Sequence, residues 1–287
     1  MSIVYLNGTY LPLEDAKISV LDRGFLFADG VYEVIPAYGG HLLRLHEHLQ
    51  RLQTNLDAIR MDNPLSNPQW QEILQRLLSE NTGEDQSVYL QVTRGVAATR
   101  NHGFPEVVTP TVFVMTTQLS KVDKEQLRPG VSAITLDDIR WKACNVKSIS
   151  LLGNILLRQQ AHDQNAAEAI LINDGKAVEG AASNVFIVRE GVLITPPTSH
   201  CLLPGITRDL ILELAQKNQM PCAERDISAQ ELATADEVWL TSSTREIMPV
   251  VELDGQPVAN GAAGPIWEKM IDTYQQYKAE LRLGHAS

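Results

Sequence analysis

The sequence has few cysteines and no long apolar run. Its three cysteines, Cys144, Cys201 and Cys222, show no CxxC spacing, which is typical of a reducing compartment and excludes a disulfide framework. No apolar stretch approaches the roughly 20 residues that span a bilayer. The first residues contain no basic region followed by an apolar one, so we expect no signal peptide. Together these absences predict a cytoplasmic protein.

Positive charge is also scarce. The chain has 24 lysines and arginines against 35 acidic residues, a net charge of −11. This balance argues against nucleic acid and anionic membranes as partners, although a site with its own local arginines could still bind a small anion. With 287 residues, 44% of them hydrophobic, the chain is long enough for one large or two medium domains.

Apolar periodicity predicts a mixture of helices and strands. Leucines at three- and four-residue steps predict an amphipathic helix over 42–59, and 68–81 is typical of a second helix. The other expected elements are strands within 3–13 (turning at Asn7-Gly8), 27–45, 87–95, 111–119, 167–197 (turning at Asp174-Gly175 and Glu190-Gly191), 237–243 and 250–258, and helices after Lys147, at 207–218 and at 265–282.

The polar segment 120–130 is the most linker-like part of the chain. We therefore expect a small N-terminal α/β domain over 1–119 and a larger C-terminal domain over 120–287. Helices and strands mix without strict alternation, and several strands are joined by hairpins. This pattern predicts a mixed α/β (α+β) fold rather than a barrel or a doubly wound sheet.

Several common motifs are missing. His46 and His48 are two residues apart on the expected helix, and the zinc-protease spacing would need a histidine where Gln50 stands. We therefore expect no metal site. Neither a phosphate-binding glycine loop of the usual patterns nor a G-x-S-x-G elbow is present, which weakens nucleotide-binding and serine-hydrolase interpretations.

Lys147, in the segment NVKSISLLGN, precedes an apolar helical pattern. The ordinary interpretation is a solvated loop lysine. The functional one is an amine kept near apolar surface, where it can attack a carbonyl. The residue alone does not decide between these interpretations.

Two other features are compatible with anion binding or acid–base chemistry. Ile206 and Thr207 begin an expected helix, whose free N–H groups favour a phosphate, while Ser242 and Ser243 end a strand. An N-cap and a plain turn explain these residues equally well. Glu179 stands among small and apolar residues, so it is either exposed at a sheet edge or buried with a partner.

A resemblance to a known family rests on four segments: NVKSISLLGN, EGAASNVF, PGITRDLI and TSSTREIMPV. In this order and spacing they resemble the class IV (fold-type IV) pyridoxal-phosphate-dependent aminotransferases, which include D-amino acid and branched-chain aminotransferases and aminodeoxychorismate lyase. DRGFLFADGVYEV and LHEHLQRL resemble the family's N-terminal landmarks. The likeness runs from about residue 2 to about residue 270. It implies a two-domain fold with pyridoxal 5'-phosphate between the domains, a C-terminal cofactor-binding domain over 120–287, and a homodimer.

The resemblance assigns roles at the cofactor end of the site. It makes Lys147 the lysine that forms the Schiff base with pyridoxal 5'-phosphate and moves the proton between Cα and C4′. Glu179 corresponds to the carboxylate facing the pyridine nitrogen, which keeps the ring an electron acceptor. The phosphate contacts implied by the family are Arg51, Ile206, Thr207, Ser242 and Ser243.

At the substrate end, Arg100 and His102 in TRNHGFP resemble the D-amino acid aminotransferase branch, where such residues hold the α-carboxylate. Tyr32 corresponds to the tyrosine that joins them. A guanidinium suits a carboxylate because its fork makes two charge-assisted hydrogen bonds. The resemblance therefore implies amino-group transfer between D-amino acids, such as D-alanine and D-glutamate, and 2-oxo acids.

Other activities remain open from sequence. They are a branched-chain L-amino acid or (R)-amine aminotransferase, aminodeoxychorismate lyase, and a catalytically silent binding protein. Ala181 and Ala182 replace serines that are frequent in the D-amino acid branch, and Pro36 replaces a frequent lysine. These departures leave the lysine chemistry intact, but they affect the expected side-chain range of the substrate or the binding of the cofactor.

Overall fold

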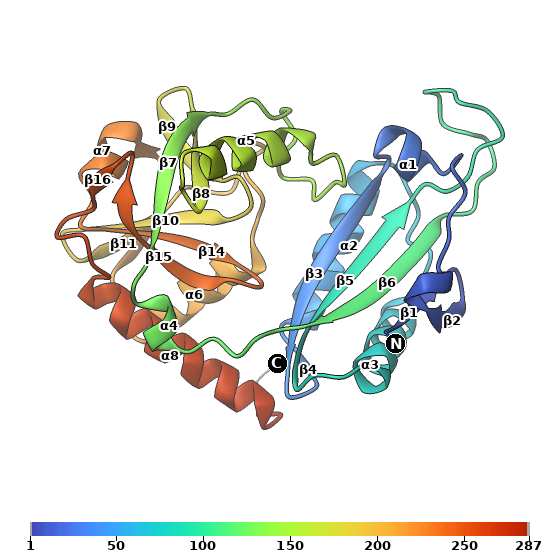
Figure 1. The fold of residues 1–287 in the computed structure, drawn as a ribbon, viewed down its shortest axis with the longest axis horizontal. Helices are drawn as coiled ribbons and strands as arrows, with labels where there is room; N and C mark the ends of the chain where they lie inside the picture. Colours follow the sequence, from blue (N-terminus) through green and yellow to red (C-terminus); the bar gives the residue numbers. More distant parts are fainter. Residues whose placement is uncertain (1, 286–287) are drawn as a thin grey trace. The chain divides into compact units, whose positions relative to one another are not determined.

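The structure is a computed structural model that describes residues 2–285. The chain forms two compact units (Figure 1). The first contains the chain up to Ser120, Val146–Ser150 and the residues from Glu280 onward, and the second contains Lys121–Asn145 and Leu151–Ala279. Lys147 thus lies in the first unit, whereas the expected limits of 1–119 and 120–287 put it in the second. The prediction of a mixed α/β fold is confirmed.

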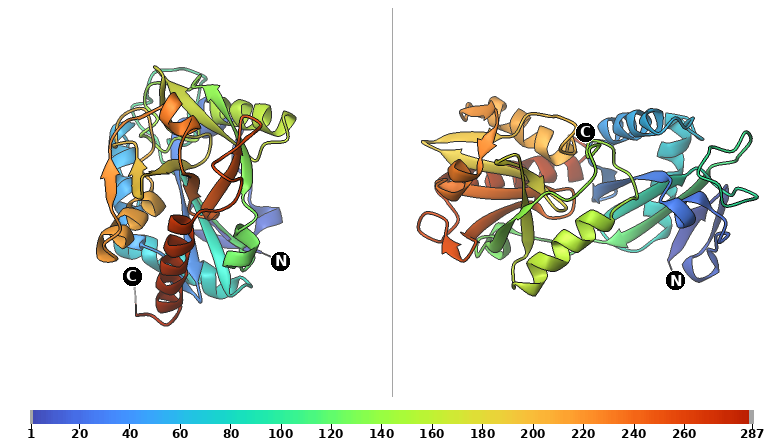
Figure 2. Two further views of the ribbon diagram at one scale, coloured as in Figure 1. Left: turned by 90° about the vertical axis from the view of Figure 1, so that its left-hand side faces the viewer. Right: turned by 90° about the horizontal axis from the view of Figure 1, so that it is seen from above.

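The first unit is built on an antiparallel sheet of order β2-β1-β6-β5-β3-β4. Its strands are β1 Ile3–Leu6, β2 Thr9–Pro12, β3 Gly30–Tyr38, β4 His41–Leu42, β5 Asp85–Thr93 and β6 Thr111–Gln118. Asn7 and Gly8 turn between β1 and β2 with φ of 48° and 93°, the left-handed values that such a tight turn requires. Helices α2, Leu45–Ala58, and α3, Asn67–Glu80, lie on one face of this sheet (Figures 1 and 2).

Alternation along the strands divides the sheet into two faces. Val31 and Ile35 on β3 are fully buried in the core with Leu52 and Leu56 of α2. Glu33 stands between these two apolar positions and so faces the helices as well. The opposite face carries half-buried residues: Tyr32 and Val34 on β3, Tyr89 and Gln91 on β5, and Phe113 and Met115 on β6.

Two short helices precede strand β3 in the chain. The 3₁₀ turn η1 covers Leu13–Asp15, and helix α1 covers Arg23–Phe27. Asp22 caps α1 by accepting a 2.7 Å hydrogen bond from the Gly24 N–H, and its other oxygen accepts one of 2.7 Å from Thr111. Helix α1 was not expected from sequence, because five residues are too few to show helical periodicity.

The second unit is built on a sheet of order β12-β11-β10-β14-β15-β7-β8-β9-β13, with β16 paired to β15. The strands are β7 Val131–Asp137, β8 Glu168–Asn173, β9 Lys176–Gly180, β10 Asn184–Arg189, β11 Val192–Thr195, β12 Cys222–Glu224, β13 Ile227–Ser228, β14 Glu237–Ser242, β15 Glu246–Leu253 and β16 Gln256–Pro257. Its helices are α4 Lys124–Leu127, α5 Leu152–Asp163, α6 Ile206–Lys217, α7 Ala229–Ala233 and α8 Pro265–Arg282. The linker-like segment 120–130 therefore contains a short helix, whose Leu127 is buried.

The helix predicted after Lys147 is α5, but it begins only at Leu152, so Lys147 lies outside it. Leu152 and Ile155 are 69% and 60% exposed. The helix buries Leu157 and Ala161 instead, so its apolar stripe is wider than the surface that packs on its own unit. Within the described chain, no helix combines the length and apolar character needed to cross a membrane.

Candidate active site

Lys147 is held by main-chain pairing in the first unit. Its carbonyl oxygen accepts a 3.0 Å hydrogen bond from the Tyr32 N–H, and Ser148 forms an antiparallel bridge with Val31. Its own N–H donates to Oδ1 of Asn55 on α2 at 3.3 Å. The Lys147 ammonium lies 4.2 Å from the centre of the Tyr32 ring, within the range of a cation–π contact. A strand and a helix therefore fix the base of this lysine.

Arg51, on α2, is paired with a carboxylate. Its Nε and Nη2 donate to the two oxygens of Glu33 at 2.8 and 2.6 Å, the bidentate geometry that suits a guanidinium. Nδ1 of His48 lies 2.8 Å from the same carboxylate. All three side chains are buried. The sequence identified Arg51 but not its partner Glu33.

This triad has defined charges. Burial opposes ionisation of Glu33, but the Arg51 guanidinium and the hydrogen bonds outweigh it and hold the pKa of Glu33 well below its usual range. Burial lowers the pKa of His48. A neutral His48 beside an ionised carboxylate must carry its proton on Nδ1, which leaves Nε2 as an acceptor; among residues 2–285, this buried Nε2 has no hydrogen-bond partner.

Arg100 and His102 lie together on the loop between β5 and β6, and both side chains are exposed. The guanidinium carbon of Arg100 lies 5.0 Å from the centre of the Phe27 ring, and the ring of His102 lies 5.1 Å from it. Among residues 2–285, neither side chain forms a hydrogen bond, ion pair or ring contact with Tyr32. The structure thus brings Arg100 and His102 to one loop and Tyr32 to Lys147, as two separate pairs.

In the second unit, Glu179 on β9 is buried and fully paired. Oε1 accepts a 2.5 Å hydrogen bond from Arg140, and Oε2 accepts one of 3.0 Å from the Leu203 N–H. Asp138 in turn holds the Arg140 guanidinium through contacts of 2.9 and 2.8 Å. Of the two alternatives left open by the sequence, the structure shows the buried carboxylate with a partner.

Burial dominates the electrostatics of Glu179. It raises the pKa of Glu179 to about 7, while Arg140 and the Leu203 N–H oppose the rise. The adjacent Arg140 stays charged, because the carboxylates of Asp138 and Glu179 raise its pKa. A carboxylate with a pKa near neutrality beside a fixed cation suits a ring nitrogen that must share a proton.

The start of α6 lies beside this carboxylate. Gly205 is the N-cap, Ile206 and Thr207 are the first helical residues, and the N-cap residue makes no side-chain hydrogen bond to this turn. Asn184 connects the two features, because its amide donates to Glu179 at 3.4 Å and to the Leu203 carbonyl at 2.9 Å. A Cβ atom on Gly205 would lie 1.9 Å from Oδ1 of Asn184, so only glycine fits there.

Ser242 and Ser243 lie at the turn between β14 and β15. Asn184 pairs in register with Thr241, the preceding residue, so this turn also lies near Glu179 and α6. The Thr241 hydroxyl is buried and has no hydrogen-bond partner in the part of the chain that the structure describes. At the far side of the turn, Glu246 accepts hydrogen bonds from Lys278 and, at 2.6 Å, from Gln275.

The two units thus contain different chemical groups. The first contains an amine and a buried arginine. The second contains a buried carboxylate, a helix start and hydroxyls, which are groups able to contact a protonated ring nitrogen or an anion. The sequence missed Arg140, Asp138, Glu33 and His48. Glu33 could have been found, because it breaks an apolar face in the same way as Glu179 does.

Comparisons with known proteins agree with this chemistry. The family model described as amino-transferase class IV matches residues 30–253. D-alanine aminotransferase of Staphylococcus epidermidis is 39% identical over 277 residues, which cover 96% of this chain and 98% of that protein. D-alanine aminotransferase of Listeria monocytogenes is 42% identical over 265 residues, covering 92% and 91%.

A solved structure has the same fold. The branched-chain aminotransferase of the thermophilic archaeon Thermoproteus uzoniensis, solved with norvaline, aligns with a TM-score of 0.89 and 27% identity, covering 99% of this chain and 96% of that one. The relatives with about 40% identity and this structure with 27% thus differ in the amino acids that their names state.

Proposed function

The chain belongs to the class IV aminotransferases, which depend on pyridoxal 5'-phosphate, and we propose that it transfers amino groups between D-amino acids and 2-oxo acids. The observation that carries the proposal is the placement of Lys147, a lysine fixed by β3 and α2 with its ammonium 4.2 Å from the Tyr32 ring centre. When bound, pyridoxal 5'-phosphate supplies an electron sink for the carbon that loses its proton.

Lys147 has two tasks in this proposal. Its amine would hold the cofactor through the aldehyde group, and the same amine would move a proton at the Cα of the substrate. Because the main chain of Lys147 is tied to Tyr32 and Asn55, its side chain extends from a fixed base, and we infer that the amine serves one side of that carbon. A fixed side of proton delivery is what makes the reaction selective for one enantiomer.

Glu179 would face the pyridine nitrogen of the cofactor. Arg140 occupies one of its oxygens and the Leu203 N–H contacts the other, so the carboxyl group cannot turn away from its position. An anionic carboxylate at the ring nitrogen keeps that nitrogen protonated, which strengthens the electron sink.

The phosphate of the cofactor would be held by the N–H groups of Ile206 and Thr207 and by the hydroxyls of Ser242 and Ser243, with Arg51 as counter-charge. The uncapped first turn of α6 fits an anion. Arg51 already neutralises Glu33, so its net attraction for the phosphate is smaller than that of a lone arginine. The first turn of α6 therefore carries more of the phosphate affinity than the sequence implied.

Arg100 and His102 would hold the α-carboxylate of the substrate, with Tyr32 assisting. The guanidinium fork of Arg100 is exposed and so is available to a ligand. The curated relatives of about 40% identity are named D-alanine aminotransferases, which favours D-amino acids over branched-chain L-amino acids and (R)-amines. Lys147, Glu179 and Arg51 are all present, which disfavours a silent binding protein.

We further propose a cytoplasmic homodimer. Ile139, Trp141, Leu152, Ile155 and Leu156 are about half exposed or more, and we call these residues the α5 patch. Gly153 of α5 packs on Arg140, so the two parts of the patch are neighbours. An exposed apolar area of this kind is typical of a subunit interface.

The decisive experiment mixes the cofactor-loaded enzyme with D-alanine and 2-oxoglutarate and follows pyruvate formation. We expect turnover with D-alanine well above that with L-leucine, and none with Lys147→Ala. Faster turnover of L-leucine would move the enzyme to the branched-chain branch. Elimination of pyruvate from aminodeoxychorismate, without consumption of 2-oxoglutarate, would identify a lyase.

A further inference from the structure

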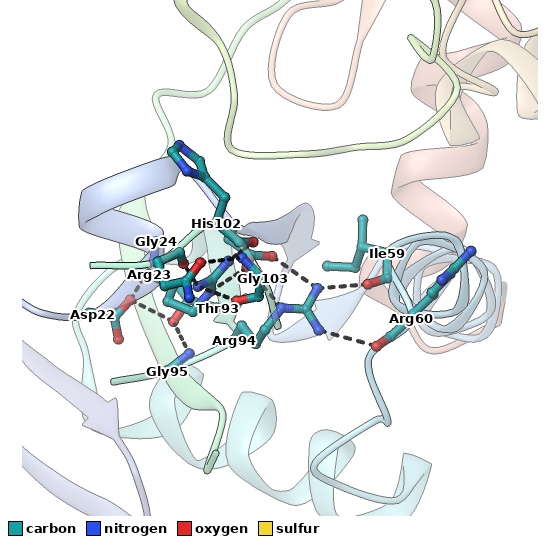
Figure 3. Close-up of polar contacts among 12 residues, drawn as sticks. Asp22, Arg23, Gly24, Ile59, Arg60, Thr93, Arg94, Gly95, His102 and Gly103 are labelled. Atoms are coloured by element: carbon teal, nitrogen blue, oxygen red, sulfur yellow. Dashed lines mark hydrogen bonds and ion pairs between the residues drawn. The ribbon is translucent and has the colours of Figure 1, made fainter. Parts of the chain in front are cut away.

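The loop that carries Arg100 and His102 combines exposed side chains with a tightly held main chain. A single buried guanidinium, that of Arg23, contacts three consecutive carbonyl groups of this loop (Figure 3). Nη1 donates to the carbonyl oxygens of Asn101 at 2.6 Å and Gly103 at 3.2 Å, and Nη2 donates to that of His102 at 3.2 Å. A loop kept only for chain reversal would not need a buried charge to fix its path.

Arg23 is itself held in position by Asp29. Its Nε donates to Oδ2 of Asp29 at 2.8 Å, so the fork has one orientation. Arg94 donates to both oxygens of the same carboxylate, at 2.8 and 3.0 Å. Asp29 therefore joins two arginines whose charges it partly neutralises.

Arg94 connects this pair to helix α2. It donates to the carbonyl oxygens of Ile59 at 2.7 Å and Arg60 at 3.2 Å, which follow the last helical turn (Figure 3). The positive charge of Arg94 also interacts favourably with the negative end of the helix dipole. Arg94 further stacks on Phe104 of the loop at 3.8 Å. Arg23, Asp29 and Arg94 thus form a brace from the loop to the end of α2.

The brace holds the loop through main-chain oxygens and through the Phe104 ring, while the side chains of Arg100 and His102 are exposed. Arg100 and His102 flank Asn101, so fixing the carbonyls of residues 101–103 fixes the main chain from which both side chains extend. The contact of Phe27 with Arg100 and His102 comes from the same helix, α1, that carries Arg23. One short helix therefore determines both the path of the loop and the location of its two polar side chains.

We propose that Arg23 is a positioning residue for the α-carboxylate of the substrate, acting through the loop that presents Arg100 and His102. The inference rests on the proposed function, because it requires those two residues to bind the carboxylate. Arg23 does not touch the substrate. Its effect is therefore confined to ligands that carry a carboxylate, whereas a purely structural role would affect all ligands alike.

The test compares Arg23→Gln with the wild type in the cofactor-loaded enzyme. The probes are D-alanine, propionate as a competing carboxylate, and ethylamine, which is alanine without its carboxylate. Displacing a binding group by about 1 Å can weaken binding on the order of 100-fold. We expect the KM for D-alanine and the inhibition constant for propionate to rise together by roughly 10- to 100-fold, with ethylamine binding changed by less than about twofold. Arg76→Gln, which removes a half-exposed arginine stacked on Tyr10 in the same unit, controls for loss of an arginine away from the loop.

The double variant shows whether Arg23 acts through the loop. Arg23→Gln combined with Arg100→Ala should weaken the binding of D-alanine no further than Arg100→Ala does alone. Equal losses for D-alanine and ethylamine in Arg23→Gln would overturn the inference, and so would an unchanged KM in a variant that binds cofactor normally. If Arg23→Gln does not fold, Asp29→Asn keeps the shape of the brace and should show a smaller loss confined to carboxylates.

The two variants test the carboxylate site and the role of Arg23 separately. If Arg100→Ala itself affects D-alanine and ethylamine equally, the assignment of the carboxylate site is wrong. If Arg100→Ala is selective for carboxylates and Arg23→Gln is not, the carboxylate site stands and the brace has no part in it.

Discussion

At the scale of the residue, two buried glutamates show how neighbours decide the state of a carboxyl group. Glu33 and Glu179 both lie on strands among apolar residues, and each contacts one arginine. Glu33 has a bidentate guanidinium and a histidine N–H, and its pKa falls below the usual range. Burial raises the pKa of Glu179 to about 7, because a single guanidinium nitrogen and the Leu203 N–H offset only part of its effect and the nearby charge of Asp138 adds to it. The same residue type is thus permanently charged in one unit and titratable in the other.

The raised pKa of Glu179 predicts a pH dependence of stability in the cofactor-free protein. Between pH 4.5, its ordinary value, and about 7, the folded state holds a proton that the unfolded state has released. The free energy of unfolding should therefore fall as the pH rises across this range, by about 3 kcal/mol at most. Glu179→Gln should flatten the slope in urea titrations at pH 5, 6 and 7. An identical slope in the variant would contradict the assignment.

Glu33 should give a pH dependence of stability with the opposite sign. Its folded pKa lies below the ordinary 4.5, so its contribution is complete above that pH and is lost as the pH falls below it. Glu33→Gln should therefore leave the slope between pH 5 and 7 unchanged and should reduce the loss of stability on acidification.

The pairing of Arg51 with Glu33 changes what a substitution at Arg51 measures. Arg51→Ala leaves a buried carboxylate without its guanidinium, which should lower the free energy of unfolding by roughly 3–5 kcal/mol. Arg51→Ala combined with Glu33→Gln removes that charge and should recover much of the stability. Cofactor retention on dialysis, measured by absorbance, should stay weak in both variants if Arg51 binds the phosphate. If the double variant retains the cofactor fully, the role of Arg51 is structural only.

At the scale of the element, the approach to α6 connects the Glu179 carboxylate to the first turn of the helix. Leu203 contacts Glu179 through its N–H, and two residues later Gly205 begins the helix that presents Ile206 and Thr207. Asn184 fills the space that a side chain at 205 would need. The helix start and the carboxylate are therefore mechanically connected.

Gly205→Ala should lower both stability and cofactor affinity, because the new methyl group overlaps Asn184. Overpacking of this kind typically lowers stability by about 1–3 kcal/mol. Asn184→Ala removes the overlapping atoms, so the double variant should lose less than the sum of the two single losses. Urea unfolding and cofactor titration of the four proteins check this, and strict additivity would show that the two residues do not interact.

The elements also show how far the sequence could be interpreted. Helices near 42–59 and 68–81 were predictable, because their apolar residues repeat at helical spacing and pack on their own unit. Leu152 and Ile155 repeat at the same spacing but are exposed. Periodicity alone therefore could not predict whether these side chains are buried. Arg140 and Glu179 are 39 residues apart and meet only through sheet pairing, which a single sequence does not reveal. The brace to Arg23 was hidden for the same reason.

At the scale of the whole molecule, the α5 patch predicts self-association. Ile155→Asp places a charge in the centre of an apolar area and should dissociate the homodimer, which sedimentation velocity would detect as a halving of mass. Leu283→Asp, at an equally exposed leucine outside the patch, should leave the mass unchanged. A wild-type protein that sediments as a monomer at micromolar concentration would contradict the proposed dimer.

The path of the chain between the two units has a practical consequence for dividing the protein. Residues 146–150 complete the edge of β3 although they follow the first stretch of the second unit, and Arg282 returns from α8 to pair with Asp85. A gene cut after Ser120 would therefore yield two polypeptides, of which the second still carries the segment 146–150 that pairs with β3 of the first. Co-expressed, these halves have the hydrogen bonds and the ion pair to recognise each other without a covalent joint. The enzyme is thus a natural candidate for a split reporter, in which neither half carries a complete lysine site and reassembly restores it.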